Sequence, residues 1–131
     1  MRQGGDGPDG YRFDWQGYIQ QTTRSYRERI QHRIEAKQTQ INRRRDVYEE
    51  AVADLQSELD DVQQQLTGMG PTRERRDRLR RRRDQLSRDL MEVRERFSED
   101  IRRLEDTVLE LEAELEELCE AEKLLEEIVN R

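Results

Sequence analysis

The sequence is poor in the residues on which most active sites and compact cores depend. It has one cysteine, one histidine, two prolines and seven glycines among 131 residues, and 5% of its residues are aromatic. Hydrophobic residues make up 31% and charged residues 43%, whereas ordinary domains are close to half apolar and about a quarter charged. These scarcities argue against a large globular core. One elongated helical domain is the simplest interpretation.

The single cysteine, Cys119, and the single histidine, His32, argue against the common metal and nucleophile sites. A zinc site needs about four nitrogen or sulfur ligands, and nucleophilic catalysis needs a base beside its nucleophile. The sequence also lacks a glycine-rich phosphate loop. We therefore expect a non-enzyme with no catalytic residues, no metal, no other cofactor and no small-molecule substrate.

Long hydrophobic runs are missing as well, since no stretch approaches the roughly 20 apolar residues that span a bilayer. Residues 1–10 contain four glycines and one proline and no apolar segment of a secretory signal, so we expect a flexible tail there. Together with one cysteine, these features favour no membrane insertion and a cytoplasmic or other intracellular location. A virus-encoded structural or assembly protein is an open alternative.

What the chain does have is a regular hydrophobic period. Apolar residues recur every three or four positions, which is typical of the hydrophobic seam of a coiled coil, the line of residues that faces the partner helix. In the second half these residues are Leu86, Leu90, Val93, Phe97, Ile101, Leu104, Val108, Leu111, Leu115, Leu118 and Leu125. In the first half they are Ile41, Arg45 in place of an apolar residue, Tyr48, Val52, Leu55, Leu59, Val62 and Leu66. Nearer the N-terminus the pattern loosens to Trp15, Tyr18, Thr22, Tyr26, Ile30 and Ile34.

One short break, Gly68-Met69-Gly70-Pro71, interrupts this period. Gly68 suits the left-handed position after a helix, and Pro71 suits the first turn of the next helix. The sequence therefore predicts an all-α fold, a long antiparallel two-helix coiled-coil hairpin over residues 11–131. We expect helix 1 at about 11–67, a turn at 68–71 and helix 2 at about 71–130, with residue i opposite about 139 minus i.

The charges support antiparallel pairing. Residues 11–53 carry nine basic and six acidic side chains, whereas residues 86–128 carry six basic and sixteen acidic ones. Folding the chain back on itself places these unlike charges together, while a parallel dimer would place the acidic segment against its own copy. A hairpin within one chain is therefore favoured, with swapped or larger assemblies still open.

The open end of the hairpin, where the chain starts and finishes, collects the aromatic residues of an aromatic-poor chain. Together with the apolar residues opposite, they form a stripe too wide for two helices to bury, and exposed aromatic patches commonly anchor interfaces. The predicted partner-binding residues are Tyr11, Phe13, Trp15, Tyr18, Ile19, Leu124, Leu125, Ile128 and Val129. The alternative is that these side chains cap the frayed helix ends. We expect a structural or adaptor protein that mediates protein–protein assembly or self-association.

An arginine-rich run beside the turn carries the alternative function, nucleic-acid or other polyanion binding, because guanidinium groups pair with phosphates. The candidate residues are Arg73, Arg75, Arg76, Arg78, Arg80, Arg81, Arg82 and Arg83. Seven acids surround them, namely Asp54, Glu58, Asp60, Asp61, Glu74, Asp77 and Asp84, which leaves a net charge near +1. An internally salt-bridged, solvated tip is the opposing interpretation. The sequence does not identify the partner or the oligomeric state.

Overall fold

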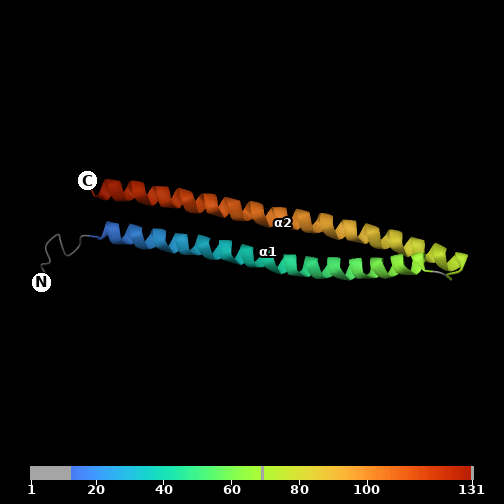
Figure 1. Cartoon of the computed structure of the whole chain (residues 1–131). Helices are drawn as coiled ribbons and strands as arrows, with labels where there is room; N and C mark the ends of the chain where they lie inside the picture. Colours follow the sequence, from blue (N-terminus) through green and yellow to red (C-terminus); the bar gives the residue numbers. More distant parts are fainter. Residues whose placement is uncertain (1–12, 69, 131) are drawn as a thin grey trace, which may run out of the picture. The chain divides into compact units, whose positions relative to one another are not determined.

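The structure is a computed structural model that describes residues 13–68 and 70–130. It contains two α-helices, α1 (Trp15–Thr67) and α2 (Arg73–Val129), and the described residues form no strand. The two helices pack against each other (Figure 1). This confirms the all-α two-helix fold. The expected tail at residues 1–10 and the expected helix start at residues 11–12 lie outside the described residues.

The connection between the helices differs from the sequence prediction in two details. The left-handed backbone falls at Gly70, with φ of 122°, rather than at Gly68, whose N–H still bonds to the Gln64 carbonyl at 3.0 Å. Pro71 lies outside α2, which begins after Thr72. The Thr72 hydroxyl accepts a hydrogen bond from the Arg75 N–H at 3.2 Å. A threonine oxygen satisfies a free N–H at the helix start, so Thr72 rather than Pro71 sets that start.

Contacts within the chain define two units, and both helices contribute to each. The turn unit comprises residues 36–108, and the open-end unit comprises residues 1–35 and 109–131. Each unit is held by its own part of the hydrophobic seam, and the two are described separately below.

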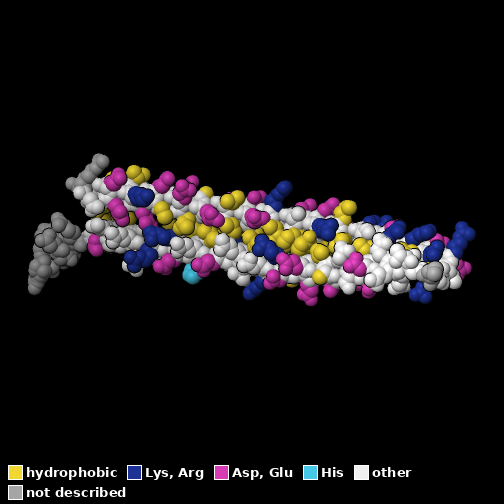
Figure 2. Space-filling model, viewed as in Figure 1, with side chains coloured by type: hydrophobic (Ala, Val, Ile, Leu, Met, Phe, Trp, Pro, Cys, Tyr) yellow, Lys and Arg dark blue, Asp and Glu magenta, His cyan; other side chains and the backbone are white. Residues whose placement is uncertain are grey.

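The turn unit has an almost continuous apolar core between α1 and α2. Its buried apolar side chains are Val62, Leu86, Leu90, Ile101 and Val108, and Leu86 is 1% exposed. Figure 2 shows hydrophobic side chains gathered where the two helices meet. Contacts across this unit join rising numbers on α1 to falling numbers on α2. They are Arg44 with Asp100, Glu58 with Arg82, and Gln65 with Arg75. The helices are therefore antiparallel, as predicted.

The register departs from the predicted sum of 139 by different amounts along the turn unit. The rings of Tyr48 and Phe97 stack with centroids 4.0 Å apart, and their residue numbers add up to 145 rather than 139. Nearer the turn, the residue numbers of Glu58 and Arg82, and those of Gln65 and Arg75, add up to 140. The predicted register therefore holds to within one residue near the turn and is lost toward Tyr48 and Phe97. Arg45, expected within the seam, is exposed.

The open-end unit has a smaller core, in which Ile30 and Leu111 are the buried apolar side chains of the described residues. Trp15, Tyr18 and Tyr26 do not face α2 as the loose pattern suggested, since each is more than half exposed. Counting back from Ile30 in steps of three and four, the inward positions of α1 are Arg27, Thr23 and Ile19, all half-buried. Two of these positions are polar: Thr23 donates a hydrogen bond to the Ile19 carbonyl at 2.8 Å, and Arg27 pairs with Glu122 of α2.

Candidate functional site

An aromatic cluster opens α1. The rings of Phe13, Trp15 and Tyr18 meet edge to face, with centroids 4.7 Å apart for Phe13 and Trp15 and 5.4 Å apart for Phe13 and Tyr18. Trp15 is 63% exposed, and the other two are also more than half exposed. The described ring contacts of the cluster are with one another. Three rings are thus held together while most of their surface faces solvent.

The helix start fixes the position of this cluster. Asp14 lies between Phe13 and Trp15, and its Oδ1 accepts a hydrogen bond from the Gly17 N–H at 2.9 Å. An aspartate at this place satisfies a free N–H of the first turn and favours the helix dipole. The cap therefore anchors the backbone at the point where the aromatic side chains leave it.

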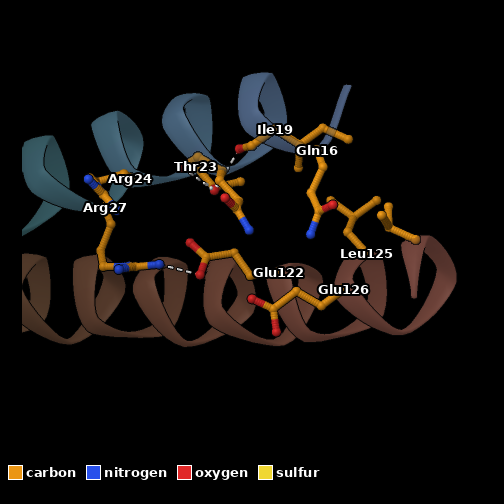
Figure 3. A pocket seen from close by; sticks show the side chains of 10 residues that line it. Gln16, Ile19, Thr23, Arg24, Arg27, Glu122, Leu125 and Glu126 are labelled. Atoms are coloured by element: carbon orange, nitrogen blue, oxygen red, sulfur yellow. Dashed lines mark hydrogen bonds and ion pairs between the residues drawn. The ribbon is translucent and has the colours of Figure 1, made fainter. Parts of the chain in front are cut away.

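The apolar residues predicted opposite the cluster divide into two groups. Leu124, Ile128 and Val129 are exposed on α2. Leu125 of α2 and Ile19 of α1 are both half-buried. The ninth predicted residue, Tyr11, lies outside the described residues. Ile19, Leu125 and Val129 also line a groove of about 240 Å³ between the helix ends (Figure 3). The structure thus brings these three of the predicted residues together.

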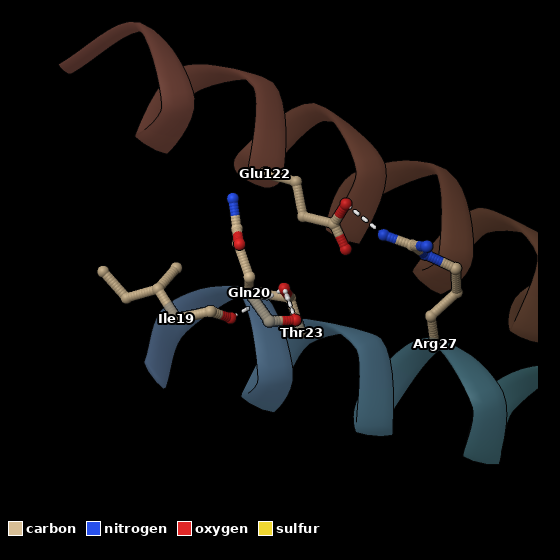
Figure 4. A network of polar contacts seen from close by, with 5 residues as sticks. All are labelled: Ile19, Gln20, Thr23, Arg27 and Glu122. Atoms are coloured by element: carbon tan, nitrogen blue, oxygen red, sulfur yellow. Dashed lines mark hydrogen bonds and ion pairs between the residues drawn. The ribbon is translucent and has the colours of Figure 1, made fainter. Parts of the chain in front are cut away.

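The other residues that line the groove are polar. Arg27 of α1 donates a hydrogen bond through Nη2 to Oε2 of Glu122 on α2, forming an ion pair across the seam (Figure 4). Their side chains are 35% and 18% exposed. The hydrogen bond from Arg27, reinforced by its charge, holds the pKa of Glu122 below its usual value against the opposing effect of burial. The same hydrogen bond and charge raise the pKa of Arg27.

Neither Arg27 nor Glu122 was expected at the site. Glu122 fills the place left empty between Leu118 and Leu125 in the hydrophobic pattern, and Arg27 fills the step between Thr23 and Ile30. The available signal was this gap in the three-and-four spacing, opposite a basic residue on the other helix. An ionic pair inside a coiled-coil seam typically specifies register and orientation at some cost in stability.

The arginine run beside the turn lies on the surface of the turn unit. Seven of its eight arginines are exposed and Arg83 is half-buried. Arg82 pairs with Glu58 of α1 at 2.6 Å, and Arg75 donates to Gln65 of α1 at 3.3 Å. The remaining ion pairs are local to α2, with 3.9 Å between Arg80 and Asp77 and 3.3 Å between Arg83 and Asp84. Among the described residues, one of the eight arginines therefore pairs with an acid of the opposite helix.

The lone histidine and cysteine lie apart. His32 is exposed on α1, 3.9 Å from the carboxylate of Glu35, and Cys119 is half-buried on α2. Within residues 13–68 and 70–130, no three or more His, Cys, Asp or Glu side chains are grouped in a way that suits a metal ion. Neither α1 nor α2 is apolar over a sufficient length to cross a membrane.

The fold and its helix-end groove define a two-helix antiparallel hairpin with an exposed aromatic start. The chain belongs to the protein family described as a family of unknown function, DUF8104, whose model matches residues 5–128. No curated protein and no solved structure matches the chain. The matched residues include all of α1 and all but the last residue of α2.

Proposed function

We propose that this chain is a non-catalytic structural or adaptor protein that docks on a protein partner through its open end. The observation that supports this proposal is the exposure of Phe13, Trp15 and Tyr18, three aromatic rings fixed beside a capped helix start. Tryptophan and tyrosine are the residues that most often dominate binding energy at interfaces. If the rings acted as a cap over the helix ends, they would cover the groove and lose more of their exposed surface.

The charge of the open-end unit indicates which kind of partner surface it would bind. The described part of the open-end unit, residues 13–35 and 109–130, carries five basic and twelve acidic side chains. Its exposed apolar residues Leu124 and Ile128 therefore stand among carboxylates. Oppositely charged surfaces attract and like charges repel, so the partner surface is apolar at its centre and basic around it.

Mutation of the cluster tests this proposal. The double variant Trp15→Ala/Tyr18→Ala should abolish association, measured as absolute mass by light scattering behind size exclusion and as co-purification with a partner from the native cells. Far-ultraviolet circular dichroism should change little, because the exposed rings contribute little to helix packing. Val47→Ala is the matched control, since Val47 is 67% exposed in the turn unit.

Two results would contradict the proposal. Association that survives in the double variant would remove the aromatic cluster from the interface. A chain that stays at the monomer mass of 15.9 kDa and captures no partner would remove the docking function itself. The mass is measured at low and high salt, because an apolar interface persists in high salt and a purely charged one does not.

A further inference from the structure

The eight arginines beside the turn fall into two stripes on opposite sides of the seam of α2. Residues three and four apart share one side of a helix. The 73–83 stripe contains Arg73, Arg76, Arg80 and Arg83. The 75–82 stripe contains Arg75, Arg78 and Arg82. Leu79 and Leu86, which face α1, lie between them, and Arg81 points away from both.

The 75–82 stripe faces the acids of α1. Its two contacts across the hairpin, Arg82 to Glu58 at 2.6 Å and Arg75 to Gln65 at 3.3 Å, identify the side of α1 that lies beside it. Asp54, four residues before Glu58, and Asp61, three residues after it, belong to that same side of the helix. Three acids of the opposite helix thus lie on the side that carries the three arginines of this stripe, and one of them, Glu58, forms an ion pair with Arg82.

The 73–83 stripe faces fewer acids. The other side of α1 carries Gln56, Gln63 and one acid, Asp60, which accepts a hydrogen bond from Gln56 at 3.1 Å. On the face drawn in Figure 2, the turn end has dark-blue side chains over α2 and mostly white ones over α1. The four arginines of the 73–83 stripe thus face one acid of α1, whereas the three arginines of the 75–82 stripe face three.

The ion pairs of the 73–83 stripe are local to α2. Among the described residues, Arg80 and Arg83 pair with acids of their own helix, at 3.9 Å and 3.3 Å, and such exposed pairs are worth little. In the part of the chain that the structure describes, Arg73 and Arg76 make no ion pair. The four guanidinium groups follow a straight helix over about 15 Å, which suits a linear polyanion.

We propose that the 73–83 stripe binds the phosphodiester backbone of nucleic acid without sequence specificity. No aromatic residue lies between Tyr48 and Phe97, so this surface offers no side chain for base stacking and contacts the backbone alone. An anionic membrane fits less well, because the apolar side chains between the two stripes, Leu79 and Leu86, face α1 and are not available to insert. The proposal concerns the turn unit and is independent of docking at the open end.

Fluorescence anisotropy with a short labelled DNA duplex, and with one of its single strands, tests the proposal in the full chain. Neutralising four phosphates predicts that affinity falls about 100-fold between about 50 and 200 mM salt. The triple variant Arg73→Gln/Arg76→Gln/Arg80→Gln should lower the affinity at low salt more than about tenfold and flatten the salt dependence.

The matched control removes the same charge from the other stripe. Arg75→Gln/Arg78→Gln/Arg82→Gln should lower the affinity less than about threefold, because those arginines already face acids. Circular dichroism should report equal helicity for both variants. Equal losses in the two variants would overturn the stripe, since net charge alone would explain them. Absence of binding at low salt, or tighter binding to phosphatidylserine vesicles than to either DNA, would overturn nucleic acid as the ligand.

Failure here differs from failure of the docking function. Trp15→Ala/Tyr18→Ala should leave the DNA affinity unchanged, and the Arg73 triple variant should leave open-end association unchanged. DNA binding that disappears with the aromatic variant would overturn the assignment to the turn unit.

Discussion

The turn unit and the open-end unit are built from the same two helices and differ in how those helices are held together. Five of the seven buried apolar side chains in the described residues belong to the turn unit. In the open-end unit, Thr23 and Arg27 occupy inward positions of α1, and Glu122 of α2 pairs with Arg27. One unit is closed by hydrophobic burial, and the other is joined partly by charge.

The two units also differ in net charge. Residues 36–108 carry seventeen basic and seventeen acidic side chains, whereas the described residues of the open-end unit have an excess of seven acids. Apolar burial stabilises a coiled coil, while exposed ion pairs contribute only about 0 to 1 kcal/mol each. The turn unit should therefore supply most of the stability, and the open-end unit should retain apolar and acidic surface for a partner.

The largest effect is expected from the core of the turn unit. Leu86→Ala should lower the free energy of unfolding by about 2 to 5 kcal/mol, because Leu86 is 1% exposed and its loss leaves a cavity. Leu118→Ala in the open-end unit should cost about 1 to 2 kcal/mol, because Leu118 is half-buried and loses less contact. Urea unfolding followed by circular dichroism measures both. Equal costs would show that the two units contribute alike.

A smaller, stabilising effect is expected from replacing the ion pair in the seam of the open-end unit with apolar residues. Arg27→Leu/Glu122→Leu should raise the thermal midpoint by a few degrees, because two leucines bury apolar surface without the desolvation cost of two charges. In addition, Arg27 Nε and Glu122 Oε1 are buried without a hydrogen-bond partner among the described residues. Either single leucine variant should lower the midpoint, since each leaves one charge unpaired within the seam.

A double leucine variant that melts at or below the wild-type temperature would contradict this prediction. The ion pair would then stabilise the open-end unit at least as well as two leucines do, and the two units would not differ in how strongly their seams hold them. A change in oligomeric mass in the double variant, with the midpoint raised, would instead show that the pair selects the hairpin over other assemblies.

The parts of this fold that the sequence predicted are those carried by aliphatic residues. Leu86, Leu90 and Leu111 recur at the spacing of a coiled-coil seam. In a chain of two helices, the apolar side of the other helix is the surface that can bury them, and this predicts the hairpin. The predicted register matches the pairs nearest the turn, Glu58 with Arg82 and Gln65 with Arg75, and misses the stacked rings of Tyr48 and Phe97 by six residues.

The hydrophobic pattern has a gap at Glu122, but it does not identify Arg27 as the partner of that residue. Arg27 and Glu122 lie 95 residues apart and resemble the other charged residues around them until the register is known. The division of the arginines into two stripes was hidden for the same reason. It depends on which side of α1 carries acids, and only the cross-helix contacts of Arg75 and Arg82 reveal that side.

The smallest expected effect is a pH dependence of the open-end unit. Because Arg27 lowers the pKa of Glu122, the pair contributes stability above the ordinary glutamate pKa of about 4.3 and loses it as the pH falls through the lower pKa of the folded state. The thermal midpoint of wild type should therefore exceed that of Glu122→Gln at neutral pH, and the gap should close in acid. Glu120→Gln, which removes an equal charge from an exposed position, should show no deficit at neutral pH. A difference in thermal midpoint between wild type and Glu122→Gln that stays constant into strong acid would mean that the ionised carboxylate does not stabilise the unit. The open-end unit would then be held by apolar contacts, like the turn unit.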